Sequence, residues 1–459
     1  MTGTDRFDVF VIGGGGTGSE IVSRLAGAGL HVGMAERDRL GGECTWYGCV
    51  PTKIMIRSAK IVALARGAGE FGVRIPDVDV DFEAVRARVL RIVEMSTSAG
   101  ATPFTERGAR VIFDEVRVTG PSQLETSAGE RIVADRIVFA SGTQASVPAI
   151  EGLRDGPHWT NKEAIWHDGG VPSSLVVIGG GPIGVEFAQI YSRFGTRVTI
   201  LESLDRILPP EDDDSGIALR AALEAEGISI VTGAAIESAH HRDGTWRIES
   251  GGREPLEAER VLVATGRRPM LDGHDLDAAG VKLDDEDKPV LDDTMRTTAS
   301  NIWAAGDATG ELLFTHVGGY EANLVVDDIL GRPRARNYRV VPKVTYSDPE
   351  VASVGLSERA AREADHDVVI ATLLLKDNER AVIDGTPAGH VKLIADRRSG
   401  ALLGGHIVGD GAGAMIHEVV VAMAGDVAAR TVGNAIHAYP TLSETVGGAF
   451  AELADAIDG

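Results

Sequence analysis

The sequence predicts an α/β protein that contains two Rossmann-like dinucleotide-binding domains. Two observations predict this class. A glycine-rich turn that follows a buried strand and opens a helix occurs twice, and each copy is followed by a glutamate at the end of the next strand. The chain of 459 residues, 43% of them hydrophobic, is long enough for about three domains. We therefore expect at least one further domain beside the two nucleotide-binding ones.

The first copy of the pattern lies near the N-terminus. A buried strand is expected over 7–12, a helix to about Ala28, and a second strand that ends at Glu36. The glycines of its G-x-G-x-x-G frame are Gly13, Gly15 and Gly18. In this frame the first glycine permits a tight turn and the second lets the backbone approach a pyrophosphate, whose charge the helix N-terminus stabilises. The glutamate is then placed to bind a ribose diol.

The second copy begins in the middle of the chain. A strand is expected over 175–178, a helix to about Phe194, and a strand that ends at Glu202. The glycines of this copy are Gly179, Gly181 and Gly184. A glutamate at this position repels a 2′-phosphate, so Glu202 favours NADH, whereas the nearby Arg206 leaves NADPH open. The alternative is that both glutamates merely end strands at the surface.

The chain contains only two cysteines, Cys44 and Cys49, which form a C-x4-C pair beside glycines. We expect a helix over about 52–66, whose positive end stabilises a thiolate at Cys49. A zinc site is not favoured because no further His or Cys cluster accompanies the pair. A structural disulfide would close so short a loop that its entropic gain is small. The pair is therefore predicted to be redox-active.

The composition of the chain limits its possible partners and its cellular location. The formal net charge of −23 argues against nucleic acid or an anionic membrane as a partner. No apolar run reaches the ~20 residues of a membrane span, and we expect no signal segment because the first residues lack a basic region followed by an apolar one. We expect a cytoplasmic protein, in which a lone cysteine pair is catalytic rather than structural. The acidic run 211–214 is expected to be a solvated helix start, where negative charge suits the helix dipole.

Taken together, these motifs resemble the flavoprotein disulfide reductases, the group of dihydrolipoamide dehydrogenase, glutathione reductase and mercuric reductase. The resemblance covers nearly the whole chain, and the further segments that carry it are 139–143, 264–269, 302–308 and 344–355. It implies a homodimer. It also implies an FAD-binding domain over 1–150 and 267–335, an NAD(P)-binding domain over 151–266 and a C-terminal α+β dimerisation domain over 336–459.

The resemblance also implies the cofactors, FAD and NADH or NADPH, and the residues that hold them. The FAD-binding residues would be Gly13, Gly15, Gly18, Glu36, Lys53, Gly142 and Asp307, and the nicotinamide dinucleotide would be held by Gly179, Gly181, Gly184, Glu202 and Gly266. Asp307 would reach the ribityl or phosphate region of FAD, with surface capping as the alternative. Lys53 would contact the flavin and pair with Glu186, because either charge alone in an apolar site is costly.

The resemblance implies that electrons pass from NAD(P)H through the flavin to a Cys44–Cys49 disulfide and on to a disulfide-type acceptor. Cys49 would lie nearest the flavin, and Cys44 would attack the external substrate. Thiol exchange needs an acid–base group. In the family this group is a histidine from the partner subunit, which stands before a proline and is held by a glutamate.

The C-terminal motif departs from the family at this position. Tyr439 stands before Pro440, while Glu444 keeps the offset of the family glutamate. The ordinary pKa of tyrosine is ~10 against ~6.5 for histidine, so at neutral pH Tyr439 is a serviceable acid and a poor base. His437 is the alternative base, but we expect it to have a core or supporting role.

Three functions stay open. The first is reduction of a disulfide-type small-molecule acceptor, as in dihydrolipoamide dehydrogenase. The second resembles mercuric reductase, where this position is also tyrosine, and would reduce a metal ion or a quinone with Cys44 and Tyr439. The third is a flavin redox sensor or complex subunit without turnover. The candidate catalytic residues are Cys44, Cys49, Lys53, Glu186, Tyr439 and Glu444, and no metal site is predicted.

Overall fold

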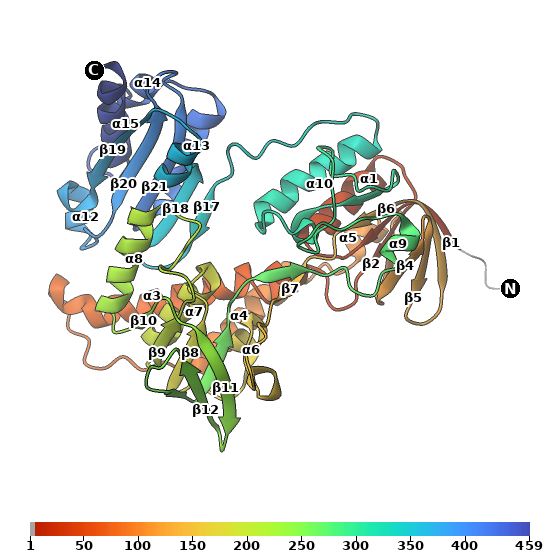
Figure 1. Ribbon diagram of the computed structural model, residues 1–459, viewed down its shortest axis with the longest axis horizontal. Helices are drawn as coiled ribbons and strands as arrows, with labels where there is room; N and C mark the ends of the chain where they lie inside the picture. The colour runs from red at the N-terminus through yellow and green to blue at the C-terminus, as the bar shows by residue number, and fades with distance from the viewer. Residues whose placement is uncertain (1–4) are drawn as a thin grey trace. The chain divides into compact units, whose positions relative to one another are not determined.

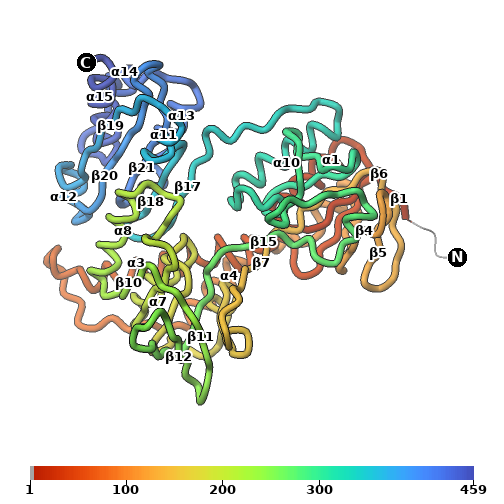
Figure 2. The backbone as a smooth tube through the Cα atoms, in the orientation of Figure 1, coloured from red at the N-terminus to blue at the C-terminus, as the bar shows by residue number. Residues whose placement is uncertain are grey.

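The computed structural model describes residues 5–459 and divides them into two compact units, each built from three segments of the chain. Unit 1 contains 5–54, 84–146 and 266–337, and unit 2 contains 55–83, 147–265 and 338–459. Figure 2 traces the chain as it alternates between them. The predicted domain boundaries divide the chain differently and stay a prediction.

Unit 1 is built on a seven-stranded sheet with the order β3-β2-β1-β6-β5-β4, in which β16 also pairs with β6. Its strands are β1 (Asp5–Ile12), β2 (Val32–Ala35), β3 (Arg110–Ile112), β4 (Val116–Gly120), β5 (Gln123–Thr126), β6 (Arg131–Phe139) and β16 (Ile302–Ala304). β1 runs parallel to β2 and β6, whereas β4, β5 and β6 form an antiparallel meander. A small antiparallel sheet joins β7 (Thr143–Ala145) to β15 (Arg267–Pro269).

Two helices of unit 1 lie side by side against this sheet, α1 (Gly16–Gly27) and α10 (Thr315–Ile329) (Figure 1). Val9 of β1, Leu25 of α1 and Val325 of α10 are fully buried in the core between them. The other helices that lie in unit 1 or enter it are α2 (Gly42–Trp46), α3 (Cys49–Gly67), α4 (Phe82–Thr97), α5 (Thr102–Thr105), α9 (Leu276–Ala279) and the 3₁₀ turn η3 (Gly306–Thr309).

The N-terminal part of unit 2 contains two sheets, a parallel four-stranded sheet with the order β10-β9-β8-β14 and an antiparallel sheet with the order β11-β12-β13. The strands are β8 (Ser174–Ile178), β9 (Arg197–Leu201), β10 (Ser229–Val231), β11 (Ile236–Arg242), β12 (Thr245–Ser250), β13 (Leu256–Ala258) and β14 (Arg260–Val263). The helices and 3₁₀ turns are η1 (Ala68–Phe71), η2 (Leu153–Asp155), α6 (Asn161–Trp166), α7 (Pro182–Arg193) and α8 (Asp213–Ala225).

The C-terminal part of unit 2 holds a five-stranded antiparallel sheet with the order β17-β18-β21-β20-β19. Its strands are β17 (Lys343–Thr345), β18 (Glu350–Gly355), β19 (Val368–Leu374), β20 (His390–Asp396) and β21 (Leu402–Gly409). The helices and the 3₁₀ turn are α11 (Glu358–Glu363), η4 (Leu375–Asp377), α12 (Glu379–Ile383), α13 (Ala412–Ala424), α14 (Ala429–Gly433) and α15 (Ser443–Asp458). Ile416 of α13 and Phe450 of α15 are fully buried against the strands.

The predicted fold class is confirmed. Both predicted strand-turn-helix-strand units are present, as β1-α1-β2 and β8-α7-β9, and each glutamate follows its second strand directly. The helix after the cysteines begins at Cys49, three residues earlier than expected. Pro51 lies in its first turn, where proline is tolerated because backbone N–H groups there make no hydrogen bond within the helix.

The acidic run also begins a helix as predicted, because Asp212 is the N-cap of α8. The expectation that the run is solvated is wrong for Glu211 and Asp212, which are buried. Their charges are balanced by lysines that sequence spacing does not reveal, Lys343 and Lys392.

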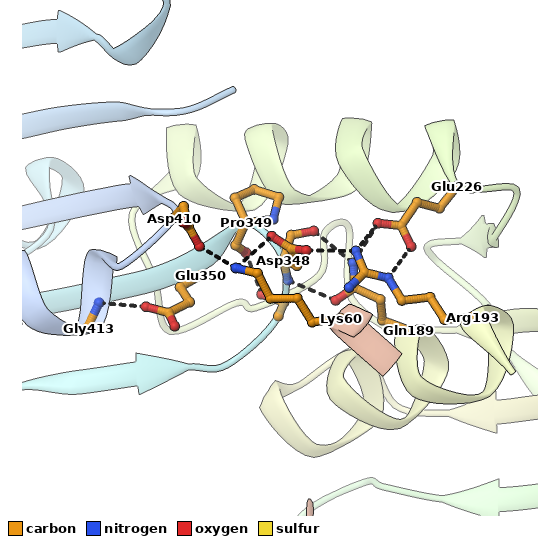
Figure 3. A network of polar contacts seen from close by, with 10 residues as sticks. Lys60, Gln189, Arg193, Glu226, Asp348, Pro349, Glu350, Asp410 and Gly413 are labelled. Atoms are coloured by element: carbon orange, nitrogen blue, oxygen red, sulfur yellow. Dashed lines mark hydrogen bonds and ion pairs between the residues drawn. The ribbon is translucent and has the colours of Figure 1, made fainter. Parts of the chain in front are cut away.

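A polar network holds several elements of unit 2 together (Figure 3). The buried Arg193 of α7 forms a two-point ion pair with Glu226, with distances of 2.6 and 2.9 Å, and lies 2.9 Å from Asp348. Lys60 of α3 forms ion pairs with Asp348 and with Asp410. Breaking a buried ion pair is unfavourable because it leaves an uncompensated charge. The network therefore holds α3, α7 and the loop before β18 together.

Candidate active site

The first glycine loop has the backbone that the fingerprint requires. Gly13 has a φ of +112°, and a Cβ there would lie 2.2 Å from the Ala140 carbonyl oxygen. A Cβ on Gly18 would lie 2.0 Å from the Gly13 carbonyl oxygen. Gly15, by contrast, precedes α1 in open space, since its Cβ would meet only Gly42 at 3.9 Å. The loop therefore packs tightly at two glycines and leaves the backbone at the helix N-terminus open to a phosphate group.

The second glycine loop repeats this geometry. Gly179 has a φ of +111°, and its Cβ would lie 2.4 Å from the Ala264 carbonyl oxygen. A Cβ on Gly184 would lie 2.0 Å from the Gly179 carbonyl oxygen, and one on Gly181 would have no atom within 4 Å. Both loops thus fit the pyrophosphate of a dinucleotide.

The two glutamates are buried and face their glycine loops. Glu36 accepts a hydrogen bond from the Gly14 N–H at 2.8 Å, and Glu202 accepts one from the Gly180 N–H at 2.6 Å. The other oxygen of each carboxylate accepts from the backbone N–H two residues further on, at 2.7 and 2.8 Å. The alternative that these glutamates only end strands at the surface is therefore wrong.

The cysteine pair lies in unit 1 beside the first turn of α10. Both cysteines are free thiols; Cys44 lies in α2 and Cys49 is the first residue of α3. The Thr315 hydroxyl donates to the Cys44 sulfur at 3.2 Å and lies 3.5 Å from the Cys49 sulfur. Sequence reasoning missed Thr315, because no spacing rule relates the first residue of α10 to the cysteines.

The two thiols have different proton affinities. The hydrogen bond from the Cys44 thiol lowers the pKa of Cys49 to about 6, helped by Thr315 and the Lys53 charge against the opposing effect of burial. The same hydrogen bond, together with burial, raises the pKa of Cys44. Because the groups interact, the values belong to the pair, which loses its first proton mainly from Cys49. A thiolate is thus available at neutral pH.

A chain of polar contacts leads from Cys44 to the predicted cofactor residue Asp307. Arg267 forms an ion pair with Glu43, the neighbour of Cys44, at 2.9 Å, and its Nε donates to the Thr143 hydroxyl at 2.8 Å. The Thr143 hydroxyl in turn donates to Asp307 at 3.1 Å. Burial raises the pKa of Asp307, partly offset by the Arg267 charge. Arg267, Thr143 and Glu43 were not predicted as site residues, although all lie in or beside the quoted motifs.

Three further glycines shape this region of unit 1. Gly142 and Gly266 have φ values of +74° and +115° and stand directly before β7 and β15. Gly306 has a φ of +67°, and its N–H donates to the fully buried Glu321 of α10 at 2.6 Å. Glu321 is a buried acid that the sequence pattern did not single out, because it lies within an apolar helix.

The structure places Lys53 and Glu186 in different units. Lys53 lies one turn after Cys49 in α3, where its charge lowers the pKa of Cys49. Glu186 is buried in α7 of unit 2, where it accepts a hydrogen bond from the Tyr346 N–H at 2.9 Å. The predicted Lys53–Glu186 pair stays a prediction.

The C-terminal motif lies in unit 2 at the surface. Tyr439 is 71% exposed, and its hydroxyl donates to Glu379 of α12, which raises the pKa of the tyrosine. Glu444 accepts from the Thr441 N–H at 2.9 Å at the start of α15. The hydroxyl of Tyr439 is therefore bound by a different carboxylate from the one that the family offset suggested.

His437 has its own carboxylate. Its Nε2 lies 2.8 Å from Glu418 of α13, which raises the pKa of the imidazole. Gly447 of α15 makes room for the ring, since a Cβ there would lie 2.3 Å from it. His437 is thus packed within its own protomer and engaged with Glu418.

Across residues 5–459, no group of three or more His, Cys, Asp or Glu side chains is arranged to hold a metal ion. No helix in that range is both long enough and apolar enough to cross a membrane.

Comparison with known proteins agrees with this geometry. Residues 7–322 match the pyridine nucleotide-disulphide oxidoreductase family, and 341–450 match the dimerisation domain of that family. A dihydrolipoyl dehydrogenase of Chlorobaculum parvum is 36% identical over 96% of both chains. A mercuric reductase of Bacillus cereus is 31% identical over 96% of this chain and 70% of its own. The Cu(II) complex of the HOCl-induced flavoprotein disulfide reductase RclA from Escherichia coli has a TM-score of 0.89 and 27% identity, covering 98% of this chain and 100% of its own.

The chain therefore belongs to the pyridine nucleotide-disulphide oxidoreductase family. It is an FAD-dependent enzyme that takes electrons from NAD(P)H and resembles dihydrolipoamide dehydrogenase, as predicted. The match to the family's dimerisation domain also supports the predicted homodimer.

Proposed function

We propose that this enzyme works in the reductive direction, passing electrons from NAD(P)H through Cys44 and Cys49 to a small disulfide-type acceptor. The observation that carries the proposal is the hydrogen bond from Tyr439 to Glu379, which raises the pKa of the tyrosine above its ordinary value of ~10. At neutral pH Tyr439 is therefore protonated. It starts in the state needed to protonate a departing thiolate, and not in the state needed to deprotonate an incoming dithiol.

The two glycine loops provide the cofactor sites of this proposal. Gly13, Gly15, Gly18 and Glu36 would hold the adenosine part of FAD, and Gly179, Gly181, Gly184 and Glu202 would hold the nicotinamide dinucleotide. FAD, when bound, supplies the two-electron transfer that links NAD(P)H to the cysteine pair. The remaining chemistry belongs to side chains of the protein.

The thiol steps begin from a protonated Cys44 and a Cys49 thiolate, and the first step moves a proton against this difference in pKa. The Cys44 proton shifts to Cys49 along the hydrogen bond between them, and the Cys44 thiolate attacks one sulfur of the acceptor disulfide. Tyr439 of the other protomer gives its proton to the acceptor thiolate that leaves. The Cys49 proton then returns to Tyr439, and Cys49 attacks Cys44, which releases the second acceptor thiolate. The cysteine pair is oxidised to a disulfide, and the acceptor is reduced to one thiol and one thiolate, which takes its proton from water.

The test compares both directions in wild type, Tyr439→Phe and Tyr439→His. We expect Tyr439→Phe to slow NADH-driven disulfide reduction while leaving reduction of an artificial acceptor unchanged. Tyr439→His supplies a base with a pKa near ~6.5 and should raise NAD⁺-dependent dithiol oxidation at least ~10-fold at neutral pH. It should also raise small-disulfide reduction. Unchanged rates in both variants would overturn the role of Tyr439.

A second candidate function is reduction of a thiol-binding metal ion, which needs no base. Two observations favour it: the low pKa of Cys49 provides a thiolate ligand, and the similar RclA protein has been solved as a Cu(II) complex. NADH oxidation that depends on Cu(II) or Hg(II), survives Tyr439→Phe and is lost in Cys44→Ser would favour this function over disulfide reduction. Steady turnover with either acceptor removes the alternative of a sensor without turnover.

We also propose that the domain limits are those expected from the sequence, with FAD bound by 1–150 and 267–335, the nicotinamide dinucleotide by 151–266, and the dimer formed by 336–459. A cytoplasmic location suits this activity, because a reducing compartment keeps a lone cysteine pair available for exchange.

A further inference from the structure

The three aspartates of the acidic run at the start of α8, Asp212 to Asp214, divide their side chains between two cations of unit 2. Asp212 and Asp214 both bind the buried Lys392, at 2.9 and 2.7 Å. Asp213 turns the other way, and its carboxylate lies 3.3 Å from the guanidinium of Arg206. The three aspartates are therefore not equivalent, and only Asp213 engages Arg206.

Arg206 lies beside the second nucleotide loop. It belongs to the short segment that starts at Glu202 and returns to the glycine loop, where the Leu208 N–H donates to the Gly180 carbonyl at 2.9 Å. The preceding residue, Ile207, is so close that a Cβ on Gly180 would lie 2.9 Å from its side chain. The backbone of Arg206 is thus held between the ribose-binding carboxylate and the loop that receives the pyrophosphate.

The guanidinium of Arg206 is tied back within this segment. Its Nη2 donates to the Pro209 carbonyl at 3.0 Å and faces Asp213, while the exposed Asp205 is further away at 3.9 Å. The side chain is only 21% exposed, and its buried Nε has no hydrogen-bond partner among residues 5–459. A buried donor without a partner is unfavourable. The tied position therefore depends on the charge of Asp213.

We propose that Asp213 determines nucleotide specificity by holding Arg206 away from the 2′ position of the adenosine ribose. Enzymes that use NADPH place an arginine where it can accommodate the 2′-phosphate. Here Arg206 is close in the chain to the residue expected at the 2′ position, but Asp213 neutralises its charge. In addition, the carboxylate of Glu202 repels a 2′-phosphate. Both effects reserve the second nucleotide site for NADH. This inference rests on the proposed role of Glu202 as the ribose ligand.

The test uses a matched pair of variants in the holoenzyme, Asp213→Asn and Asp214→Asn. The two aspartates are neighbours in the first turn of α8, each side chain is 54% exposed, and each substitution removes one negative charge. Only Asp213→Asn releases Arg206. NADH and NADPH are compared as donors to ferricyanide, and NADP⁺ binding is measured by titration.

We expect Asp213→Asn to raise kcat/KM for NADPH and the affinity for NADP⁺ about tenfold, the effect of one charge-assisted hydrogen bond to a phosphate. The values for NADH should stay within about twofold, and Asp214→Asn should change neither donor. Adding Arg206→Gln to Asp213→Asn should abolish the gain, while Arg206→Gln alone leaves NADPH use unchanged, which completes a double-mutant cycle.

Three outcomes would overturn the inference. They are an equal gain in both aspartate variants, no gain in Asp213→Asn, and a marked loss of NADPH use in Arg206→Gln alone. Ferricyanide accepts electrons without Tyr439 or a disulfide substrate. Failure of the proposed acceptor would therefore leave this test intact, and failure of this test would leave the proposed acceptor untouched.

Discussion

Replacing Thr315 by valine should weaken the thiolate at Cys49. Valine has nearly the shape of threonine but lacks the hydroxyl, which lies 3.2 Å from the Cys44 sulfur and 3.5 Å from the Cys49 sulfur. A hydroxyl carries one proton and serves one sulfur at a time, so it turns to whichever sulfur is charged. In the reduced pair that sulfur is Cys49, whose pKa Thr315 helps to lower to about 6.

The size of the effect follows from the strength of that bond. A hydrogen bond to a charged group contributes about 1.5 kcal/mol at the weak end, which suits the long contact to sulfur, and one pKa unit corresponds to about 1.4 kcal/mol. We therefore expect Thr315→Val to raise the pKa of Cys49 by about one unit, from about 6 towards about 7. At a pH of about 6.5 the thiolate fraction would fall from about three quarters to about one quarter.

The assay is the pH dependence of thiolate absorbance and of iodoacetamide alkylation in the reduced enzyme, since only the thiolate reacts. Thr315→Ser is the matched control, because it keeps the hydroxyl and should keep the pKa near that of wild type. An unchanged pKa in Thr315→Val, or an equal shift in both variants, would refute the assignment of the Thr315 hydroxyl to the thiolate.

Two further predictions concern unit 1. Gly18→Ala should release FAD, because the new Cβ would lie 2.0 Å from the Gly13 carbonyl oxygen. The control Gly27→Ala lies in the same helix, has no atom within 4 Å of the new Cβ and should retain FAD. The flavin-to-protein ratio after gel filtration decides this, and full retention by Gly18→Ala would contradict it. Burial lowers the pKa of the His274 imidazole to about 4 in the folded protein, whereas it is ~6.5 in the unfolded chain. The stability that depends on a neutral His274 is therefore complete above a pH of ~6.5 and is lost as the pH falls towards about 4. Urea unfolding should show about 2 kcal/mol lost between about pH 7 and about pH 5, and His274→Gln should reduce that loss; an equal loss in the variant would exclude His274 as its source.

Much of the fold and part of the site were accessible from the sequence. The two glycine loops were predicted residue by residue, because a positive φ at Gly13 and Gly179 and the close approach at Gly18 and Gly184 leave glycine almost no substitute. The burial of the two glutamates against their glycine loops follows from the same local unit. The helix after the cysteines was predicted to begin at about 52, whereas it begins at Cys49 and holds Pro51 within its first turn.

Other site residues could not be read from the sequence, since they meet their partners only after folding. Thr315 reaches the cysteines from another segment of unit 1, and Tyr439 binds Glu379 instead of the glutamate that the family offset suggested. The acidic run was predicted to be a solvated helix start, yet its charges are divided among Lys343, Lys392 and Arg206.

The sequence alone determined the two glycine loops, the cysteine pair and the departure at Tyr439, because each is a short run in which residue type and spacing constrain the backbone or the chemistry directly. Only the tertiary structure decided the proton affinities of Cys49 and Tyr439 and the binding of Arg206 by Asp213. These depend on distances of a few ångströms between side chains, and where the chain brings such side chains together is a result of the packing of the whole unit.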